Sequence, residues 1–285
     1  MATGDVERAE GRLLVVDVGN TQTHFGVIAD GGTEVQQHWR FATVRESTSD
    51  ELGAKLSNLL ALRSMGFRDI SSSIVSSTVP QLSHHWISMA RRYLEHEMLP
   101  VSPSIKTGMP IRIDNPHEVG ADRLVNAVAA YERVRSTCVI VDFGTAITYD
   151  AVSAAGEYIG GLITPGAEIS IDALYERAAK LPKVELGAPR SLIGKSTVDA
   201  IRSGIVYGFA GQVEGIVRRL RAELGADIWV IATGGLAGAL VPYIQETIDE
   251  VDDMLTLTGL RLIWERNQPE RSRGRPGPAR VAPAH

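Results

Sequence analysis

Residues 13–28 read LLVVDVGNTQTHFGVI, and this stretch is the clearest indication of the fold. A buried apolar strand ends in a polar turn, and a second β-rich run follows it. Within the turn, Gly19 lets the backbone approach a ligand, and Asn20, Thr21 and Thr23 can donate hydrogen bonds to phosphate oxygens. Asp17 repels phosphate, so its partner would be Mg²⁺ or the water shell of that ion. The stretch indicates a phosphate site, although an ordinary hairpin turn has the same composition.

A second copy of this pattern, IVDFGTAITYDAV, occupies residues 140–152. Three positions follow their counterparts at the same offset of 125 residues: Asp142 after Asp17, Gly144 after Gly19 and Thr148 after Thr23. Repetition at this distance indicates a duplicated domain. Two such turns that face each other across a cleft would hold the phosphates of a nucleotide from both sides. The arrangement resembles the superfamily of acetate and sugar kinases, heat-shock chaperones and actin, and neither turn is a Walker P-loop.

Length and composition fit two domains. The chain has 285 residues, of which 44% are hydrophobic, and the repeat favours two domains of roughly 120–150 residues over one large core. We expect domains at 12–118 and 119–267, between a disordered leader at 1–11 and a Pro-, Gly- and Arg-rich disordered tail at 268–285. The expected fold is α/β, with two duplicated ribonuclease-H-like (actin-like ATPase) domains, mixed sheets covered by helices, and a nucleotide cleft between them.

Charge, cysteine content and hydropathy exclude several classes. The net charge of −5 gives no reason to expect nucleic acid as a partner. The single cysteine, Cys138, lies in an apolar strand and is expected to be a buried reduced thiol. The first eleven residues lack the apolar core of a signal peptide, and no run reaches the roughly 18 apolar residues of a membrane span. We therefore expect a cytoplasmic protein.

The remaining chain predicts alternating strands and helices. Strands are expected at 34–43, 70–77, 156–163 and 228–232, and helices at 49–60 with Ser49 as N-cap, 81–97 behind Pro80, 124–134, 197–224 and 255–266. His84, His85 and His96 on the second helix are expected to be solvated or hydrogen-bonded, not zinc ligands. Four glycines of the long helix, at 204, 208, 211 and 215, permit close helix approach, either inside the domain or at a subunit contact.

The segment VGADR at 119–123 opens the helix predicted at 124–134. As part of a substrate site, Asp122 would accept a proton from an attacking hydroxyl, and Arg123 would hold an anionic part of the acceptor. Asn126 falls on the same helical face as Asp122 and could join them. Capping of the helix is the simpler alternative.

Six motifs occur here in the order seen in type III pantothenate kinases, and the sequence resembles that family from about residue 13 to residue 267. They are Asp17-Val-Gly-Asn-Thr, Gly120-Ala-Asp-Arg, Asp142-Phe-Gly-Thr-Ala, Gly160-Gly161 with Pro165-Gly166, Gly194-Lys-Ser-Thr197 and Thr233-Gly-Gly235. The resemblance implies ATP-dependent phosphorylation of pantothenate, the first step of coenzyme A synthesis. It also implies a homodimer and a need for Mg²⁺ and a monovalent cation, K⁺ or NH₄⁺.

The resemblance also implies roles for single residues. The implied ATP-binding residues are Asp17, Val18, Gly19, Asn20, Thr21, Gln22, Thr23, His24 and Thr145. The implied substrate-binding residues are Gly120, Ala121, Asp122, Arg123 and Thr197. Asp122 matches the general base, Asp142 the monovalent-cation ligand, and Asp17 would hold Mg²⁺ through water. Ile113 departs from the family, because many relatives carry tyrosine at that position.

Two other classes of function fit the same residues. Another small-molecule kinase, such as a sugar or acetate kinase, or a phosphatase of the superfamily would use the same fold. A non-catalytic regulator could also use this scaffold, since the family's relatives include proteins that act in transcription. Retention of Asp17, Asp122, Asp142 and Thr145 together speaks against loss of activity.

Overall fold

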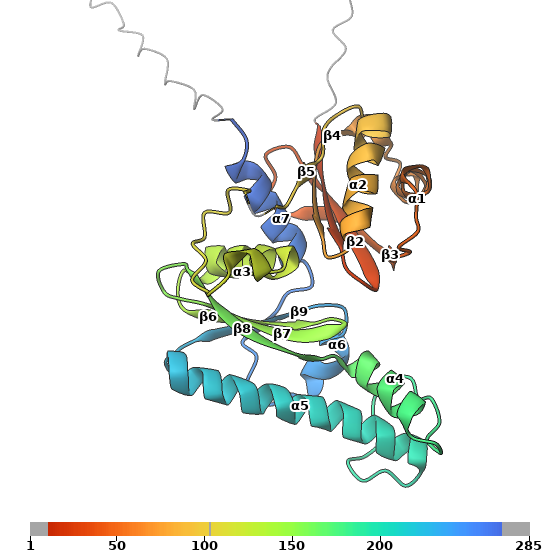
Figure 1. The fold of residues 1–285 in the computed structure, drawn as a ribbon, viewed down its shortest axis with the longest axis vertical. Helices are drawn as coiled ribbons and strands as arrows, with labels where there is room; N and C mark the ends of the chain where they lie inside the picture. The colour runs from red at the N-terminus through yellow and green to blue at the C-terminus, as the bar shows by residue number, and fades with distance from the viewer. Residues whose placement is uncertain (1–10, 103, 270–285) are drawn as a thin grey trace, which may run out of the picture.

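The computed structural model describes residues 11–102 and 104–269, which form two five-stranded sheets (Figure 1). The first sheet has the strand order β3-β2-β1-β4-β5, and the second has the order β10-β9-β6-β7-β8. In both sheets an antiparallel hairpin is joined by a strand parallel to its first member. The expected α/β fold with two similar mixed sheets is confirmed.

The first sheet grows from the opening apolar stretch. Its strands are β1 (Arg12–Val18), β2 (Gln22–Ala29), β3 (Val35–Ala42), β4 (Ile70–Ser77) and β5 (Leu99–Pro100). Because β1 is central and both its faces are covered, Leu13, Leu14, Val15 and Val16 are all almost fully buried. Helices α1 (Ser49–Ala61) and α2 (Pro80–Met89) cover its outer face, followed by the π-helical turn η2 (Ala90–Leu94).

The second sheet repeats this plan. Its strands are β6 (Cys138–Phe143), β7 (Ala146–Val152), β8 (Tyr158–Pro165), β9 (Trp229–Thr233) and β10 (Glu250–Val251). Helices α4 (Ala167–Arg177), α5 (Thr197–Leu224) and α6 (Ala237–Leu240) follow, and α5 packs its buried side chains against this sheet. Short 3₁₀ turns complete the chain at η1 (Phe67–Asp69), η3 (Pro116–Glu118) and η4 (Val241–Tyr243).

Two helices form a shared layer between the sheets. In Figure 1, α3 (Ala121–Val134) and α7 (Leu255–Arg266) lie side by side between the first and the second sheet. Their buried side chains join β1 and β4 on one side and β6 and β9 on the other in one continuous core. A single glycine, Gly259, permits the close crossing, because a Cβ there would lie 2.8 Å from a methyl carbon of Val125. The layer fixes how the two sheets face each other.

Most predicted elements are confirmed, and three helix ends differ. One is the start of α3, which lies at Ala121 and not at residue 124. Thr48, not Ser49, caps α1: its side chain accepts the N–H of Glu51, and the Glu51 carboxylate accepts the N–H of Thr48 in return. The helix predicted at 81–97 leaves the α conformation at Ala90 and ends at Glu95, which has φ +58°. Pro80 is the first helical residue, as expected.

The histidines and the cysteine have the structural roles expected of them. His96 is hydrogen-bonded to Ser73 at 2.7 Å, and His85 to Ser49 at 3.3 Å. Cys138 is fully buried, and burial raises the pKa of its thiol to about 12. It is therefore an inert core residue.

The glycines of α5 do not pack inside the domain. A Cβ added at Gly204, Gly208 or Gly211 would meet no atom within 4 Å. The interpretation that this row of glycines packs against the core of its own domain is therefore wrong. A subunit contact remains as the predicted alternative.

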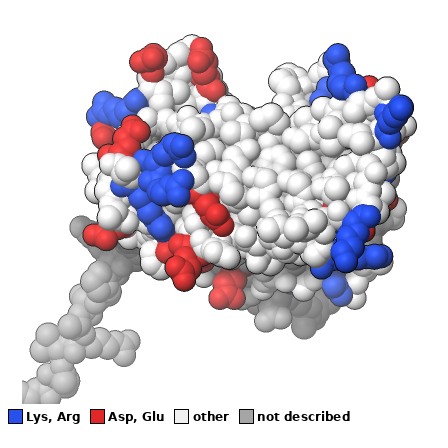
Figure 2. Space-filling view, turned by 90° about the horizontal axis from the view of Figure 1, so that it is seen from below, with Lys and Arg blue, Asp and Glu red and all other residues white. Residues whose placement is uncertain are grey.

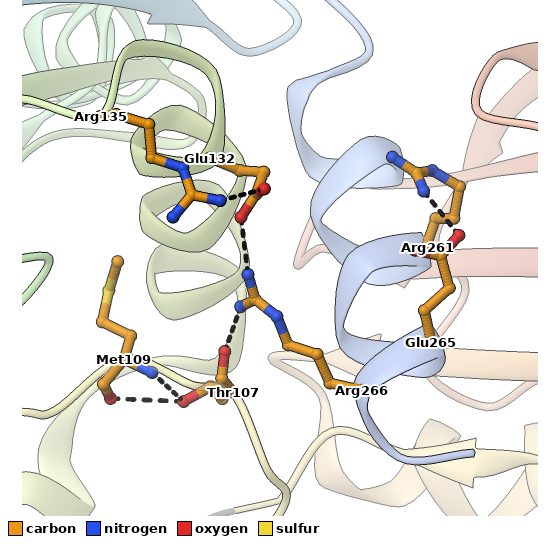
Figure 3. Close-up of polar contacts among 7 residues, drawn as sticks. All are labelled: Thr107, Met109, Glu132, Arg135, Arg261, Glu265 and Arg266. Carbon is orange, nitrogen blue, oxygen red and sulfur yellow. Dashed lines mark hydrogen bonds and ion pairs between the residues drawn. The ribbon is translucent and has the colours of Figure 1, made fainter. Parts of the chain in front are cut away.

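The end of α7 is hydrogen-bonded to the segment at 106–107, which lies between the first and the second sheet in the sequence. Figure 3 shows Arg266 donating to the carbonyl of Thr107 and, at 2.8 Å, to Glu132 on α3. Asn267 continues the contact with two hydrogen bonds to the backbone of Lys106. The predicted disordered leader and tail lie outside the described residues, apart from Gly11, Gln268 and Pro269.

Replacing Arg266 by glutamine should lower stability. The change removes a charged donor from Thr107 and Glu132 and should cost about 1–2 kcal/mol, or roughly 2–8 °C in Tm. Arg135→Gln is the matched control, because Arg135 is more exposed and pairs with the same Glu132. Differential scanning calorimetry measures both variants. An equal Tm shift in the two would show that α7 does not depend on this contact.

Candidate functional site

A cleft of about 260 Å³ lies where the two hairpin turns meet. The first turn contributes Asp17, Gly19, Asn20, Thr21, Gln22 and His24 to its lining. The second contributes Asp142, Phe143, Gly144, Thr145, Ala146 and Thr148. The segment after β9 contributes Thr233, Gly234, Gly235 and Leu236. Single residues from other elements complete it: Arg40, Thr78, Asp122, Glu168, Asp253 and Thr256.

The two turns touch each other across the cleft. The hydroxyl oxygens of Thr21 and Thr145 are 2.8 Å apart and share a hydrogen bond. Hydroxyl groups from both turns therefore lie in the same space, where they can bind phosphate oxygens. The duplication seen in the sequence has brought its two copies face to face.

The two hairpins are not identical in register. Asp17 pairs across its hairpin with His24, whereas Asp142 pairs with Thr148, so the second turn is one residue shorter. Thr148 therefore corresponds to His24, and its expected pairing with Thr23 is wrong. Thr23 points away from the cleft, is 1% exposed, and bonds the hydroxyl of Thr43 at 2.9 Å.

Asp17 carries an unpaired buried oxygen. Its Oδ1 has no hydrogen-bond partner among the described residues. Burial raises the pKa of Asp17 well above 3.8, and the negative charges of Asp122 and Asp142 raise it further. A buried carboxylate oxygen without a donor is suited to a cation or to its water shell.

Asp142 is held in one orientation by the middle layer. Its Oδ2 accepts a hydrogen bond of 3.0 Å from the side-chain amide of Asn126. The side-chain oxygen of Asn126 in turn accepts a hydrogen bond of 2.7 Å from the hydroxyl of Thr256. Asn126 therefore joins Asp142 and not Asp122, contrary to the expectation from helical spacing. Burial raises the pKa of Asp142 to about 7, with Asp122 adding to the effect. Gly234, at φ +97°, lets the chain pass beside this carboxylate.

Asp122 is not the cap of its helix. The N-cap of α3 is Gly120, and Asp122 stands in the first turn with its Oδ1 accepting the N–H of Arg123 at 2.9 Å. Its side chain lines the cleft, and burial raises its pKa. A carboxylate at this position can accept a proton from a bound hydroxyl.

His24 and Arg40 lie together at one wall of the cleft. Nε2 of His24 is 3.2 Å from Nδ1 of His38. Burial lowers the pKa of His24 to about 3, and the positive charge of Arg40 contributes. His24 is thus a neutral hydrogen-bonding group, while Arg40 supplies a permanent positive charge beside the carboxylates.

Several predicted residues lie outside the cleft. Val18 is in the core, and Thr23 faces Thr43. Gly120, Ala121 and Arg123 stand next to Asp122 but do not line the cleft. Thr197 begins α5 and lines a separate groove with Leu174, Leu181, Ala200, Ile201, Gly204 and Ile205.

Sequence reasoning missed six lining residues: Arg40, Thr78, Glu168, Leu236, Asp253 and Thr256. Leu236 directly follows the Thr233-Gly-Gly235 motif. Thr78 follows β4, which is parallel to β1, and the rule that ligands bind at the carboxyl ends of parallel strands would have found it. Glu168 stands in the first turn after the Pro165-Gly166 motif. Arg40, Asp253 and Thr256 carry no local signal.

The metal-ligating side chains are sparse. Within residues 11–102 and 104–269, no group of three or more His, Cys, Asp or Glu side chains is arranged to hold a metal ion. One or two carboxylates together with substrate phosphates are the usual way to hold Mg²⁺. No helix within these residues is both long and apolar enough to cross a membrane.

The two sheets have the actin-like fold that is also found in solved proteins assigned as sugar kinases. A protein from Sinorhizobium meliloti assigned as a 2-dehydro-3-deoxygalactonokinase has a TM-score of 0.56 at 14% identity, over 90% of this chain and 97% of that chain. A Campylobacter jejuni protein assigned to the Baf family of transcriptional activators has a TM-score of 0.52 at 18% identity, over 89% and 98%. At these identities the likeness is one of fold.

The chain belongs to the type III pantothenate kinase family. The family model of that description matches residues 13–219. A type III pantothenate kinase from Moorella thermoacetica is 51% identical over 255 residues, which cover 90% of this chain and 99% of that protein. One from Myxococcus xanthus is 48% identical over 255 residues, with 90% and 98% covered. The resemblance seen in the sequence is confirmed.

Proposed function

We propose that this protein transfers the γ-phosphoryl group of ATP to the hydroxyl of pantothenate, the first step of coenzyme A biosynthesis. The observation that carries the proposal is the contact between the two duplicated turns, Thr21 to Thr145 at 2.8 Å, in a chain of this family. Such a pair of turns can hold a polyphosphate between them. We place the reaction in the cytoplasm and keep the division into domains at 12–118 and 119–267.

Different residues in and beside the cleft would bind ATP, accept the proton and bind the acceptor. The turn at 17–24 and Thr145 would bind the ATP phosphates through N–H groups and hydroxyls. Asp122 would accept the proton of the attacking alcohol, and Arg123 would hold the acceptor's carboxylate. Phosphoryl transfer depends mainly on positioning and on charge stabilisation, so a rigid cleft suits it.

Two cations fit the carboxylates of the cleft. The unpaired Oδ1 of Asp17 fits Mg²⁺ held through water, and the oriented carboxylate of Asp142 fits K⁺ or NH₄⁺. Bound there, the cations would offset the negative charge of the phosphates. The protein's own part is to keep the carboxylate of Asp142 in place through Asn126 and Thr256.

Asp142→Ala should lower kcat by roughly 10- to 100-fold and abolish activation by K⁺. The variant removes the carboxylate that faces the cleft and leaves Asn126 in place. Turnover is measured at constant ionic strength in K⁺, NH₄⁺, Na⁺ and a bulky organic cation. Equal activity of the wild type in all four solutions would contradict a monovalent-cation site.

A homodimer would explain the exposed face of the second half. Large apolar side chains are exposed there, among them Ile163 at 64%, Leu192 at 66% and Ile193 at 79%. Figure 2 shows this side of the molecule with its charged side chains at the margins and a broad uncharged centre. A face of this kind is typical of a subunit contact. Because Thr197 is outside the cleft of its own chain, its predicted substrate contact would reach a second copy.

Mixed dimers test that arrangement. Asp122→Asn and Thr197→Val chains, each weakly active alone, should recover roughly a quarter of wild-type activity when mixed, because one cleft in half of the dimers is intact. Light scattering gives the oligomeric state. No recovery from an exchanging dimer would show that Thr197 serves its own chain, and full activity of Thr197→Val alone would show that it has no role.

A coupled assay tests the function. ADP release is followed with ATP, Mg²⁺ and K⁺ against pantothenate, acetate and several sugars. The proposal predicts release that depends on pantothenate. Equal turnover with a sugar would instead favour another kinase of the class.

A further inference from the structure

A buried carboxylate that the phosphoryl-transfer chemistry does not use lies behind Arg123. The side chain of Asp150, on β7, has no exposed surface, and that of Arg123 is 17% exposed. Nε and Nη2 of Arg123 approach Oδ1 of Asp150 at 2.8 Å and 2.7 Å. The guanidinium group is therefore held from one edge by a group that water cannot reach.

Two further donors fix Asp150 itself. The hydroxyl of Tyr158 donates to Oδ1 at 2.6 Å, and the hydroxyl of Thr148 donates to Oδ2 at 3.0 Å. Tyr158 is 1% exposed, and burial together with Asp150 raises the pKa of its hydroxyl, so it remains a donor. Both carboxylate oxygens are satisfied, which removes much of the cost of burying the charge.

The neighbouring strand leaves room for this arginine. A Cβ at Gly161 on β8 would lie 3.0 Å from Nη2 of Arg123 and would also collide with the carbonyl of Tyr149. The second glycine of the Gly160-Gly161 motif thus has a physical reason: the carbonyl of Tyr149 and the guanidinium group leave no room for a Cβ at Gly161. Arg123 in turn lies over the ring of Tyr158, at 5.9 Å from its centre.

The arrangement leaves one end of the guanidinium group for a ligand. Arginine has five N–H donors in a rigid fork, and Asp150 engages Nε and Nη2. Among the described residues, Nη1 of Arg123 has no hydrogen-bond partner. The residue directly before it is Asp122, whose side chain lines the cleft. The charges of the two side chains are near enough for Arg123 to lower the pKa of Asp122, against the larger opposite effect of burial. An anion bound by Nη1 would therefore lie near the proton acceptor, at the edge of the cleft.

We infer that Asp150, fixed by Tyr158 and Thr148, is a positioning residue that holds Arg123 so that its free end binds the carboxylate of the acceptor. The inference rests on the proposed function and deepens it. Asp150 does not touch the substrate. It sets the preference for an acceptor that carries a negative charge.

The test compares pantothenate with its neutral analogue, in which a hydroxymethyl group replaces the carboxylate. In Asp150→Asn, the KM for pantothenate should rise by roughly 10- to 100-fold, the effect of one misplaced charge-assisted hydrogen bond. The KM for ATP and the KM for the neutral analogue should stay within about 3-fold, so the preference for the charged acceptor is lost. Asp249→Asn is the control, because Asp249 also faces an arginine, Arg221 at 3.6 Å, and neither residue lines the cleft.

A double variant shows whether Asp150 acts through Arg123. Arg123→Met and Arg123→Met/Asp150→Asn should have the same KM for pantothenate within about 2-fold, since no guanidinium group remains to be placed. If Asp150→Asn does not fold, Tyr158→Phe is measured in its place. This variant removes the hydroxyl that donates to Asp150 and should raise the KM for pantothenate by roughly 2- to 5-fold.

The outcomes distinguish failure of the proposed function from failure of the role of Asp150. Wild-type protein that does not turn over pantothenate overturns the proposed function and this inference with it. Turnover by the wild type, with an unchanged preference in Asp150→Asn and Tyr158→Phe, overturns the inference alone. An equal rise of both acceptor KM values, or additive effects in the double variant, would mean that Asp150 is only a structural residue.

Discussion

Replacing Asp122 by asparagine should lower kcat by roughly 10²- to 10⁴-fold while ATP binding stays nearly unchanged. The acceptor alcohol must lose its proton as it attacks the γ-phosphorus, and asparagine cannot take it. Because the transition state of phosphoryl transfer is loose, the proton leaves late, and part of the effect is the loss of orientation of the hydroxyl. Both parts act on turnover.

The helix itself should tolerate this change. Gly120 is the N-cap of α3, and asparagine can still accept the N–H of Arg123 through its side-chain oxygen. Asp50→Asn is the matched control, because Asp50 holds the same position in the first turn of α1. Stopped-flow or steady-state kcat and Tm are measured on both variants. Turnover of Asp122→Asn near that of the wild type would remove Asp122 from the mechanism.

Asp17→Asn should lower kcat by roughly 10²- to 10³-fold, because an amide is a poor ligand for the water shell of Mg²⁺ and several kcal/mol of charge stabilisation depend on that ion. The same variant should be more stable than the wild type by about 1–2 kcal/mol, since it removes a buried carboxylate with an unpaired oxygen. Activity and stability therefore move in opposite directions.

The stability gain should depend on pH. Burial raises the pKa of Asp17 well above 3.8 in the folded state, so the unfolded chain releases this proton at a lower pH than the folded chain. The wild type then loses free energy of unfolding as the pH rises from the unfolded pKa through the folded one. The Tm difference between Asp17→Asn and the wild type should be larger near about pH 8 than near about pH 5. A lower Tm for the variant at both values would contradict the account of Asp17.

The sequence predicts strands and helices well where the apolar residues follow one clear pattern, either a continuous run or a helical spacing. The continuous apolar run before Asp17 and its copy before Asp142 define the centres of both sheets, and the helix at 197–224 was predicted with its observed bounds. The two short edge strands, β5 and β10, have two residues each and carry too little pattern to be recognised. The switch to π-helix at Ala90 likewise leaves no mark in the spacing of apolar residues.

The sequence predicts only those cleft residues that stand in one of the turn motifs. Asp17, Asn20, Asp142 and Thr145 stand in motifs, and the structure brings them together. Arg40 reaches the same cleft from the middle of the first half, with a hydrogen bond of 3.3 Å to the carbonyl of Asp253. Contacts between positions so far apart in the sequence depend on the relative orientation of the two sheets, which the layer of α3 and α7 fixes. No local sequence pattern predicts that orientation.

The same limit explains Asn126. Helical spacing places it on the face of Asp122, which suggested a shared role. The structure turns its amide to Asp142 and Thr256, because α7 packs against α3 at that point. The partner of a buried amide is decided by the element that covers it.

Product identification tests the central claim most directly. Purified protein is incubated with ATP, Mg²⁺, K⁺ and pantothenate, and the products are analysed by ³¹P NMR and mass spectrometry. The account predicts one new phosphate monoester, on the primary hydroxyl of pantothenate, formed in equal amount to ADP and absent with Asp122→Asn over the same time. ADP formed with inorganic phosphate and no ester, or an ester formed on a sugar in preference to pantothenate, would contradict it.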